Sequence, residues 1–335
     1  MTQVRIPNTE FPTGPTAMCL VVLALALFAA PLAADAQGKP PYRIGVVHTG
    51  FVPNTPPVEG LRAGLKALGL QEGRDLTLDI HPTKGDLQLA QTEATALAAS
   101  GVDLIFAESE RIARAVKSAT QTVPMVFVQV GDPVAAGLVT SVPHPGGNVT
   151  GVSSLATELT PKRLEFLKAV FPSVRRVRVV YHADDLSSGA AAHTAQDVAG
   201  RLKLKIVARA VRTEADLVSE LKTLRPGDGL LSPTTVMMGI PGTILDLQLM
   251  ARWPAIFYTS FWVQGGAVVA YGSPVDHDAA QAARLVARIL RGERPQDLPV
   301  ESSNTIELSI NLKTVTALGI TMPAAIRTRA DRIFP

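Results

Sequence analysis

The sequence predicts an α/β protein of two doubly wound, parallel-sheet lobes with a hinge and a cleft between them. From Tyr42 onward, short apolar runs alternate with segments whose apolar residues recur at helical spacing, which is typical of strands joined by helical crossovers. Five glycines and three prolines interrupt residues 131–151, and the same alternation starts again after them. Residues 131–151 are therefore predicted to be the seam between two lobes, with a ligand cleft between the lobes.

The first lobe begins with a strand at residues 42–47, whose nearly continuous apolar character is typical of a strand covered on both faces. Val58, Leu61, Leu65 and Leu68 then recur at helical spacing, and Gly69 ends that helix. The same reasoning predicts strands at 76–80, 102–106 and 124–130, a helix that Asp86 caps and that ends at 99, and a helix at 111–119 that Ser109 can cap.

The seam leads into the second lobe. The glycines of residues 145–151 predict a strand that enters a hinge, because glycine allows close approach of backbones. Helix and strand patterns then alternate to residue 310. Helices are predicted at 161–170, 188–202, 214–224, 240–252 and 275–290, and strands at 176–181, 205–210, 229–231, 255–258, 267–271 and 306–310. Basic, glycine and proline residues at 291–295 end the helix at 275–290.

The N-terminal segment predicts export from the cytoplasm. An apolar run at residues 17–30 is followed by Pro31 and by Ala34-Asp35-Ala36, which is a small-x-small cleavage pattern, so residues 1–36 are a predicted signal peptide cleaved after Ala36. An uncleaved anchor is the alternative, although the run is shorter than the roughly 20 residues of a membrane span. Cys19 is the only cysteine and precedes the expected cleavage site, so the mature chain would have no disulfide or thiolate metal site.

The charge and motifs exclude several classes of function. The net charge of +3 is spread along the chain without long basic runs, so no nucleic-acid partner is expected. The six histidines lack metal-motif spacing, and no nucleophile elbow or dinucleotide fingerprint appears. We therefore expect no enzyme, catalytic residue, cofactor or metal. A secreted hydrolase that uses His182 and Asp184 is the alternative, although a solvated loop explains that segment equally well.

The candidate binding residues lie where strands end, because ligands bind beyond the carboxyl ends of parallel strands. In the first lobe they are Thr49, Glu108, Ser109 and Asp132. Backbone N–H groups at a helix start beside Ser109 could bind a carboxylate, whereas Glu108 disfavours a phosphate and suits an ammonium group. Asp132 could bind a ligand amine or cap the next turn.

In the second lobe, the candidate binding residues are Tyr181, Thr234, Tyr258 and Phe261. The aromatic side chains could stack on an apolar or aromatic ligand. Burial in the core is the alternative explanation for each of them.

Longer motifs make the chain recognisable. They are Asp132-Pro-Val, Pro145-Gly-Gly-Asn-Val-Thr-Gly151 and Gly265-Gly-Ala-Val-Val-Ala-Tyr-Gly272, together with residues 288–301 and 310–323. In this order they resemble the ABC transporter substrate-binding proteins of the tryptophan/tyrosine-permease-like family, over residues 42–333.

The resemblance implies a type I periplasmic-binding fold whose two lobes, joined by three crossovers, close on a small ligand. Lobe one would comprise residues 40–152 plus 273–299, and lobe two residues 153–272 plus 300–335. The implied function is that of the periplasmic solute-binding component of an ABC importer, a monomer that delivers an amino acid or related small carboxylate to an inner-membrane permease. A receptor that reports its closed state to a signalling partner is the alternative.

Overall fold

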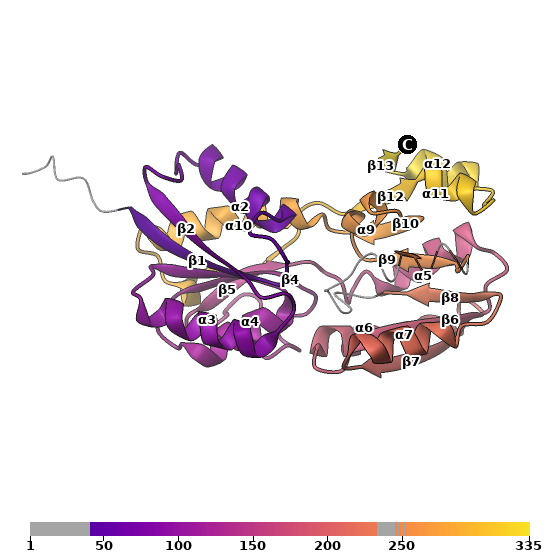
Figure 1. Cartoon of the computed structure of the whole chain (residues 1–335), viewed down its shortest axis with the longest axis horizontal. Helices are drawn as coiled ribbons and strands as arrows, with labels where there is room; N and C mark the ends of the chain where they lie inside the picture. The colour runs from indigo at the N-terminus through magenta and orange to yellow at the C-terminus, as the bar shows by residue number, and fades with distance from the viewer. Residues whose placement is uncertain (1–40, 233–244, 247, 249, 251) are drawn as a thin grey trace, which may run out of the picture. The chain divides into compact units, whose positions relative to one another are not determined.

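The computed structural model describes residues 41–232, 245–246, 248, 250 and 252–335, and all statements below concern these residues. The described residues contain two β-sheets (Figure 1). The first sheet has the order β11-β5-β4-β3-β1-β2, and all of its strand pairs are parallel. Its strands are β1 (Tyr42–His48), β2 (Leu76–Pro82), β3 (Leu104–Glu108), β4 (Met125–Val130), β5 (Val149–Ser153) and β11 (Glu301–Ser302).

The second sheet has the order β13-β12-β10-β9-β8-β6-β7 and is parallel except between β10 and β12. In both sheets the earliest strand lies between the next two in sequence, which is one of the doubly wound orders and confirms the predicted fold class. The strands are β6 (Arg176–His182), β7 (Lys205–Val211), β8 (Asp228–Leu231), β9 (Ala255–Phe257), β10 (Val269–Gly272), β12 (Glu307–Asn311) and β13 (Arg332–Phe334).

Helices cover the first sheet on both faces (Figure 1). The helices α2 (Pro56–Ala67) and α10 (Val275–Leu290) share one apolar core with that sheet, and α3 (Leu87–Ala99) and α4 (Glu110–Ala119) share another. The α2 and α10 backbones approach so closely that a Cβ atom at Gly60 would collide with the Asp276 carbonyl. The predicted helix at residues 275–290 is therefore present and packs on the first sheet.

The second sheet carries six described helices and has its own apolar cores. They are α5 (Thr160–Val170), α6 (Leu186–Ala199), α7 (Glu214–Lys222), α9 (Ser260–Gln264), α11 (Leu312–Ala317) and α12 (Ala324–Arg329). A 3₁₀ turn, η1 (Pro295–Asp297), follows α10. The predicted helix at 240–252 lies mostly outside the described residues. No described helix is long and apolar enough to cross a membrane.

Sequence periodicity located the long elements and some short strands, and it missed the other short elements. The predicted strands and helices of residues 42–130 and 161–231 are confirmed with shifts of a few residues at their ends, and β5 confirms the strand predicted from the glycines. The helices α9, α11 and α12 are too short to show a helical period, and β11 and β13 are too short to alternate.

The chain passes between the two sheets three times. It leaves the first sheet after β5, returns after β10 to form α10, and leaves again after β11 to form β12. These three segments are called the crossings below: the first starts at Ser153, the last residue of β5, the second contains Ser273 between β10 and α10, and the third contains Ser303 between β11 and β12. The exact lobe boundaries stay a prediction, and we note that β11, residues 301–302, pairs with β5 of the first sheet.

Candidate functional site

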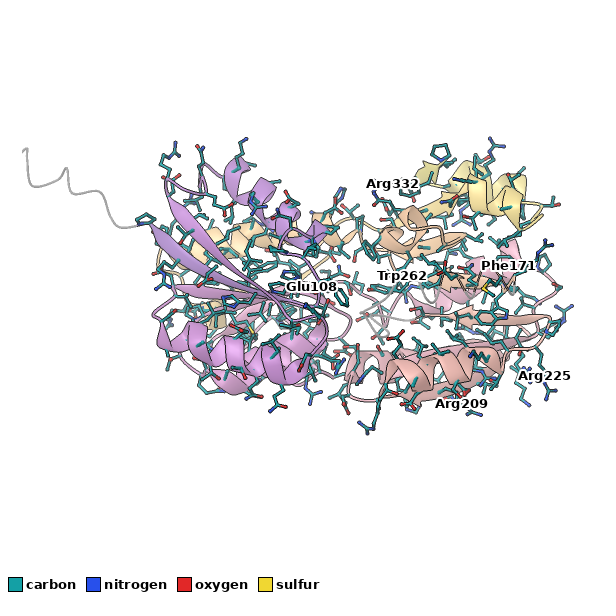
Figure 2. All side chains as sticks on the ribbon, viewed as in Figure 1. Glu108, Phe171, Arg209, Arg225, Trp262 and Arg332 are labelled. Carbon is teal, nitrogen blue, oxygen red and sulfur yellow. The ribbon has the colours of Figure 1, made fainter. Side chains whose placement is uncertain are left out.

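A cavity of about 300 Å³ is lined by residues that follow strands of both sheets. One side comes from the loop at residues 48–57 after β1, from Glu108 at the end of β3 and from Val275 at the start of α10. The other side comes from Tyr258, which follows β9, and from Phe261 and Trp262 in α9. Figure 2 shows Glu108 beside the first sheet and Trp262 beside the second. The volume lies at the lower end of the range of small-molecule sites, about 300–1,000 Å³.

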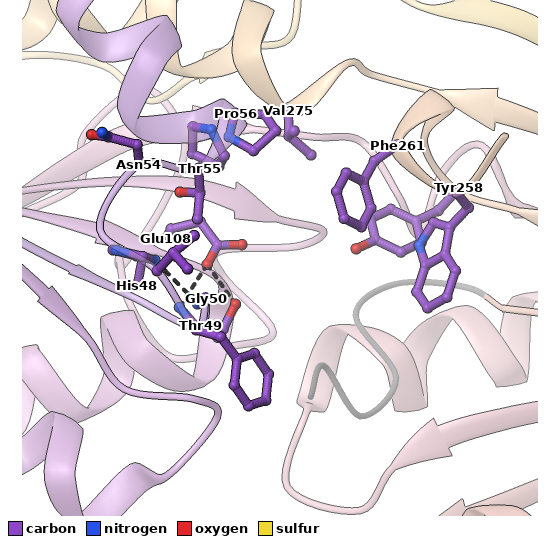
Figure 3. A pocket seen from close by; sticks show the side chains of 14 residues that line it. His48, Thr49, Gly50, Asn54, Thr55, Pro56, Glu108, Tyr258, Phe261 and Val275 are labelled. Atoms are coloured by element: carbon purple, nitrogen blue, oxygen red, sulfur yellow. Dashed lines mark hydrogen bonds between the residues drawn. The ribbon is translucent and has the colours of Figure 1, made fainter. Parts of the chain in front are cut away.

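Glu108 provides the carboxyl group of the cavity. Its Oε2 accepts hydrogen bonds from the Thr49 backbone N–H at 3.1 Å and from the Thr49 Oγ1 hydroxyl at 2.8 Å (Figure 3). Burial raises the pKa of Glu108, and the two hydrogen bonds from Thr49 oppose that shift. Because β1 and β3 are neighbours at the topological switch point of the first sheet, the two residues stand where doubly wound folds bind ligands.

His48 shapes the floor of the cavity without adding charge. Its side chain is buried, and its Nδ1 accepts a hydrogen bond from the Gly50 backbone N–H at 3.1 Å. Burial, with a smaller effect of His81, lowers the pKa of His48 to about 4, so the ring is neutral at pH 7. An acceptor Nδ1 in a neutral ring places the proton on Nε2.

An aromatic wall faces Glu108 across the cavity (Figure 3). Trp262 stacks on Phe257 with ring centroids 4.8 Å apart, and Phe261 meets the Trp262 ring edge-on at 6.3 Å. Tyr258 and Trp262 are buried, whereas Phe261 is 38% exposed. On the Glu108 side, Phe51 is 50% exposed. The cavity therefore combines one carboxylate with apolar rings on both sides.

In a second zone near the strand ends, called the closed zone below, polar groups of the protein bind one another. Glu110, two residues after Glu108, is buried, and its Oε1 and Oε2 accept hydrogen bonds from the backbone N–H groups of Leu186 and Ser187 at 2.6 and 2.9 Å. These are the first two residues of α6, whose exposed N–H groups favour an anion. Arg114 adds a hydrogen bond to the Asp184 carbonyl at 2.9 Å.

Asp132 lies in this closed zone and does not line the cavity. Its backbone N–H donates to Ser187 Oγ at 2.9 Å, while its Oδ1 accepts from the N–H groups of Val134 and Ala135 at 3.0 and 2.9 Å. Of the two roles considered for this carboxylate, the structure shows the capping of the next turn. Ligand binding by Asp132 stays a prediction.

Ser109 also lies away from the cavity, and the prediction that its hydroxyl caps the following helix is wrong. Ser109 precedes α4, but its side chain makes no capping hydrogen bond. Its φ of 82° lies in the left-handed region, whereas a capping residue needs an extended backbone to direct its oxygen at the first turn. The Ser109 backbone N–H instead donates to the Val128 carbonyl at 3.0 Å.

Some of the other predicted residues line the cavity, and others do not. Tyr181 packs against the apolar core of the second sheet and does not line the cavity, and Thr234 lies outside the described residues. Thr49, Glu108, Tyr258 and Phe261 are brought together at the cavity. Trp262 and Phe51 were not among the predicted contacts. Only their place beside predicted strand ends could have indicated them.

The His182 segment has the hydrogen bonds of a structural loop. Nδ1 of the buried His182 accepts from the Asp184 backbone N–H at 3.1 Å, and the Asp184 carboxylate pairs with Arg212 at 2.7 Å. A catalytic triad would instead direct that carboxylate at Nδ1–H. Burial, together with the positive charge of Arg111, lowers the pKa of His182. Within the described ranges, no three His, Cys, Asp or Glu side chains are grouped to hold a metal ion.

Residues 54–334 match the family model described as ABC transporter substrate binding protein. The chain belongs to this family. Its members bind solutes outside the cytoplasm and are not enzymes, and the family implies an ABC permease as partner. The fold is the type I periplasmic-binding fold.

Several individual proteins are similar to the chain. A tyrosine-binding protein of Clostridioides difficile is 27% identical over 263 residues, which cover 78% of this chain and 75% of that protein. A crystal structure of a conserved domain protein from Vibrio cholerae is 29% identical with a TM-score of 0.78, and covers 87% of this chain and 99% of that one. A Streptococcus pneumoniae ABC domain in complex with L-Trp is 24% identical with a TM-score of 0.79, and covers 88% and 100%.

Proposed function

We propose that this protein binds an amino acid with an aromatic side chain in the periplasm and delivers it to an ABC permease in the inner membrane. The observation that carries the proposal is the Glu108 carboxylate facing an aromatic wall across one cavity. An aromatic amino acid offers an ammonium group to the first and a flat ring to the second. The similarity to a tyrosine-binding protein and to a domain that holds L-Trp supports this ligand class.

Glu108 is the proposed partner of the ligand ammonium group. Thr49 holds Oε2 through two hydrogen bonds, and Figure 3 shows the carboxyl group directed at the cavity. Burial raises the pKa of Glu108 because it disfavours the charged carboxylate, and a bound ammonium group would compensate that charge. The site would therefore discriminate against ligands without a positive charge.

Phe51 and Phe261 are the proposed walls for the ligand ring. Both are large apolar side chains that remain substantially exposed in a cavity, and they come from opposite sides of it. A flat ring between them would bury apolar area at about 25 cal/mol per Å² and add favourable ring-to-ring geometry. Tyr258 would complete the wall beside Phe261.

The remaining parts of the proposed function concern export, closure of the lobes and the oligomeric state. We infer that the signal peptide is cleaved after Ala36, that the two predicted lobes close on the ligand, and that the protein is a monomer. Ser109, Asp132 and Tyr181 do not line the cavity, so their contact with a ligand requires a different arrangement of the lobes. N-terminal sequencing of the exported protein tests the cleavage, because the mature chain should begin at Gln37.

A ligand panel tests the proposed function. A ligand that binds only the native state raises the melting temperature by mass action, so tryptophan, tyrosine and phenylalanine should raise it and sugars should not. Tryptamine keeps the ammonium group and indole-3-propionate lacks it, so only tryptamine should retain a measurable shift. If no amino acid raises the melting temperature, the proposal fails.

A further inference from the structure

A buried polar cluster joins all three crossings. Each crossing contributes a buried serine, namely Ser153, Ser273 and Ser303. The Ser303 backbone N–H donates to the Ser153 carbonyl at 2.8 Å, and the Ser273 hydroxyl donates to Asp278 Oδ2 at 2.7 Å. Ser303 also lies close enough to favour the charged form of the Asp278 carboxyl. The second and third crossings therefore meet at Asp278.

Asp278 stands in α10 and is fully buried. Its Oδ2 also accepts a hydrogen bond from Gln129 Nε2 at 2.6 Å, which ties α10 to β4 across 149 residues of sequence. Gln129 has a φ of 57°, a region that residues other than glycine adopt at an energetic penalty, and the β4–β5 register shifts between Phe127 and Val130. The hydrogen bond thus holds a strained residue beside the first crossing.

No cation compensates the Asp278 carboxyl. The strands β4 and β5 carry no titratable side chain. The helix α10 itself and the other elements packed around it carry charged or titratable groups near their ends. These groups are Asp276 and His277 on α10, Glu59 and Arg62 on α2, Glu108 on β3 and Glu301 on β11. Of these groups only Asp276 acts on the pKa of Asp278, and it raises that pKa.

Two buried oxygen atoms of the cluster have no hydrogen-bond partner among the described residues: Asp278 Oδ1 and Gln129 Oε1. Both are acceptors if Asp278 is ionised, and burial of an unpaired acceptor is unfavourable. A single proton on Oδ1 changes this balance, because Oδ1 becomes a donor and Oε1 is an available acceptor. Together with the bond from Nε2 to Oδ2, a bond from Oδ1 to Oε1 would close a ring of two hydrogen bonds between the acid and the amide.

We propose that Asp278 is held as a neutral carboxylic acid that donates from Oδ1 to Gln129 Oε1, and that this acid–amide pair is a proton-dependent brace on the crossings between the lobes. The proposal does not depend on the class of ligand. Burial raises the pKa of Asp278 to about 7, which agrees with a neutral acid under mildly acidic conditions. Ionisation removes the Oδ1 donor, so the brace weakens as the proton leaves.

The sign of the pH effect follows from this shift. An acid whose pKa is higher in the folded state than its ordinary value of 3.8 binds its proton more tightly when folded. Its contribution to stability is fully present below pH of about 4, and is lost as the pH rises through about 7. The brace should therefore be firm in acid and loose in mild alkali.

The substitution Asp278→Asn tests the brace, because an amide donates and accepts as the neutral acid does but cannot ionise. We expect the melting temperature of Asp278→Asn, measured relative to that of the unsubstituted protein at the same pH, to rise between pH 5 and pH 8, and to be the higher of the two at pH 8. Asp197→Asn removes an exposed carboxyl on α6 and should keep the original pH slope. Equal destabilisation by Asp278→Asn at every pH would overturn the proposal.

Two measurements address the proton and the crossings directly. In protein labelled with ¹³C at aspartate carboxyl carbons, the signal that disappears in Asp278→Asn should titrate near neutral pH. A signal already ionised at pH 5 would contradict a neutral Asp278. Small-angle scattering of the ligand-free protein should change between pH 5 and pH 8, and Asp278→Asn should remove that change. A change that persists in the variant would exclude the brace as its cause.

Discussion

Glu108 and Glu110 are two residues apart at the same strand end, yet they belong to different kinds of site. Glu108 ends β3, is held by Thr49 and faces a cavity. Glu110 begins α4, and both of its carboxylate oxygens accept hydrogen bonds from backbone N–H groups in the first turn of α6. The difference shows that a carboxylate at a strand end is available to a ligand only where no group from the elements of the other sheet binds it. Four predictions test this contrast.

The largest expected effect is the loss of ligand binding in Glu108→Gln. The change removes the charge that we assign to the ligand ammonium group, and a hydrogen bond to a charged group contributes about 1.5–3 kcal/mol, so the Kd should rise about 10- to 100-fold. Isothermal titration calorimetry with tryptophan measures it. The melting temperature without ligand should not fall, because burial raises the pKa of Glu108 and disfavours its charge above the ordinary pKa. An unchanged Kd would remove Glu108 from the site.

The matched change on the other side of the comparison is Glu110→Gln. We expect the free energy of unfolding to fall by about 1–3 kcal/mol, because a charge-assisted contact with a helix N-terminus is lost in a buried place. Denaturant unfolding measures this change. Ligand selectivity should be retained. If Glu110→Gln changed the preference among amino acids without affecting stability, the proposed division between the two glutamates would be wrong.

Removing the ring of Phe261 should weaken the binding of aromatic ligands and leave the free energy of unfolding nearly unchanged. The side chain is 38% exposed, so its truncation leaves little cavity in the core. The lost contact area and ring geometry correspond to a Kd rise of about 10-fold for tryptophan, and less for leucine. Val142→Ala, a change at an exposed apolar residue outside the cavity lining, provides the control. Equal losses for aromatic and aliphatic ligands would argue against stacking.

The smallest effect is the pH dependence of affinity. The pKa of Glu108 lies above its ordinary value of 4.5, and an ammonium ligand binds the ionised form. Affinity should be constant above this raised pKa and should fall as the pH drops below it, by up to about tenfold per pH unit. Calorimetry from pH 4 to pH 8 gives the profile. Glu108→Gln should give a flat profile, and a profile that stays sloped in this variant would assign the titration to another group.

Much of the fold could be predicted because strands and helices of ordinary length carry their own periodicity. The strand at 42–48 and the helix at 275–290 are examples. Four of the eight predicted binding residues, Thr49, Glu108, Tyr258 and Phe261, line the cavity, and one rule chose them because all lie at or soon after strand ends. The same rule does not say which strand ends face open space. It therefore also chose Ser109 and Asp132, which do not line the cavity.

The sequence by itself determined the class of fold, the order of its longer elements and the family. It also indicated a carboxylate and aromatic residues at strand ends. These depend on neighbouring residues and on motifs that can be read along the chain. Only the tertiary structure decided that Glu110 binds the start of α6, that Ser109 has a left-handed backbone, and that Gln129 meets Asp278. Such contacts join residues separated by tens to hundreds of positions, and their energies depend on burial and geometry that no local pattern encodes.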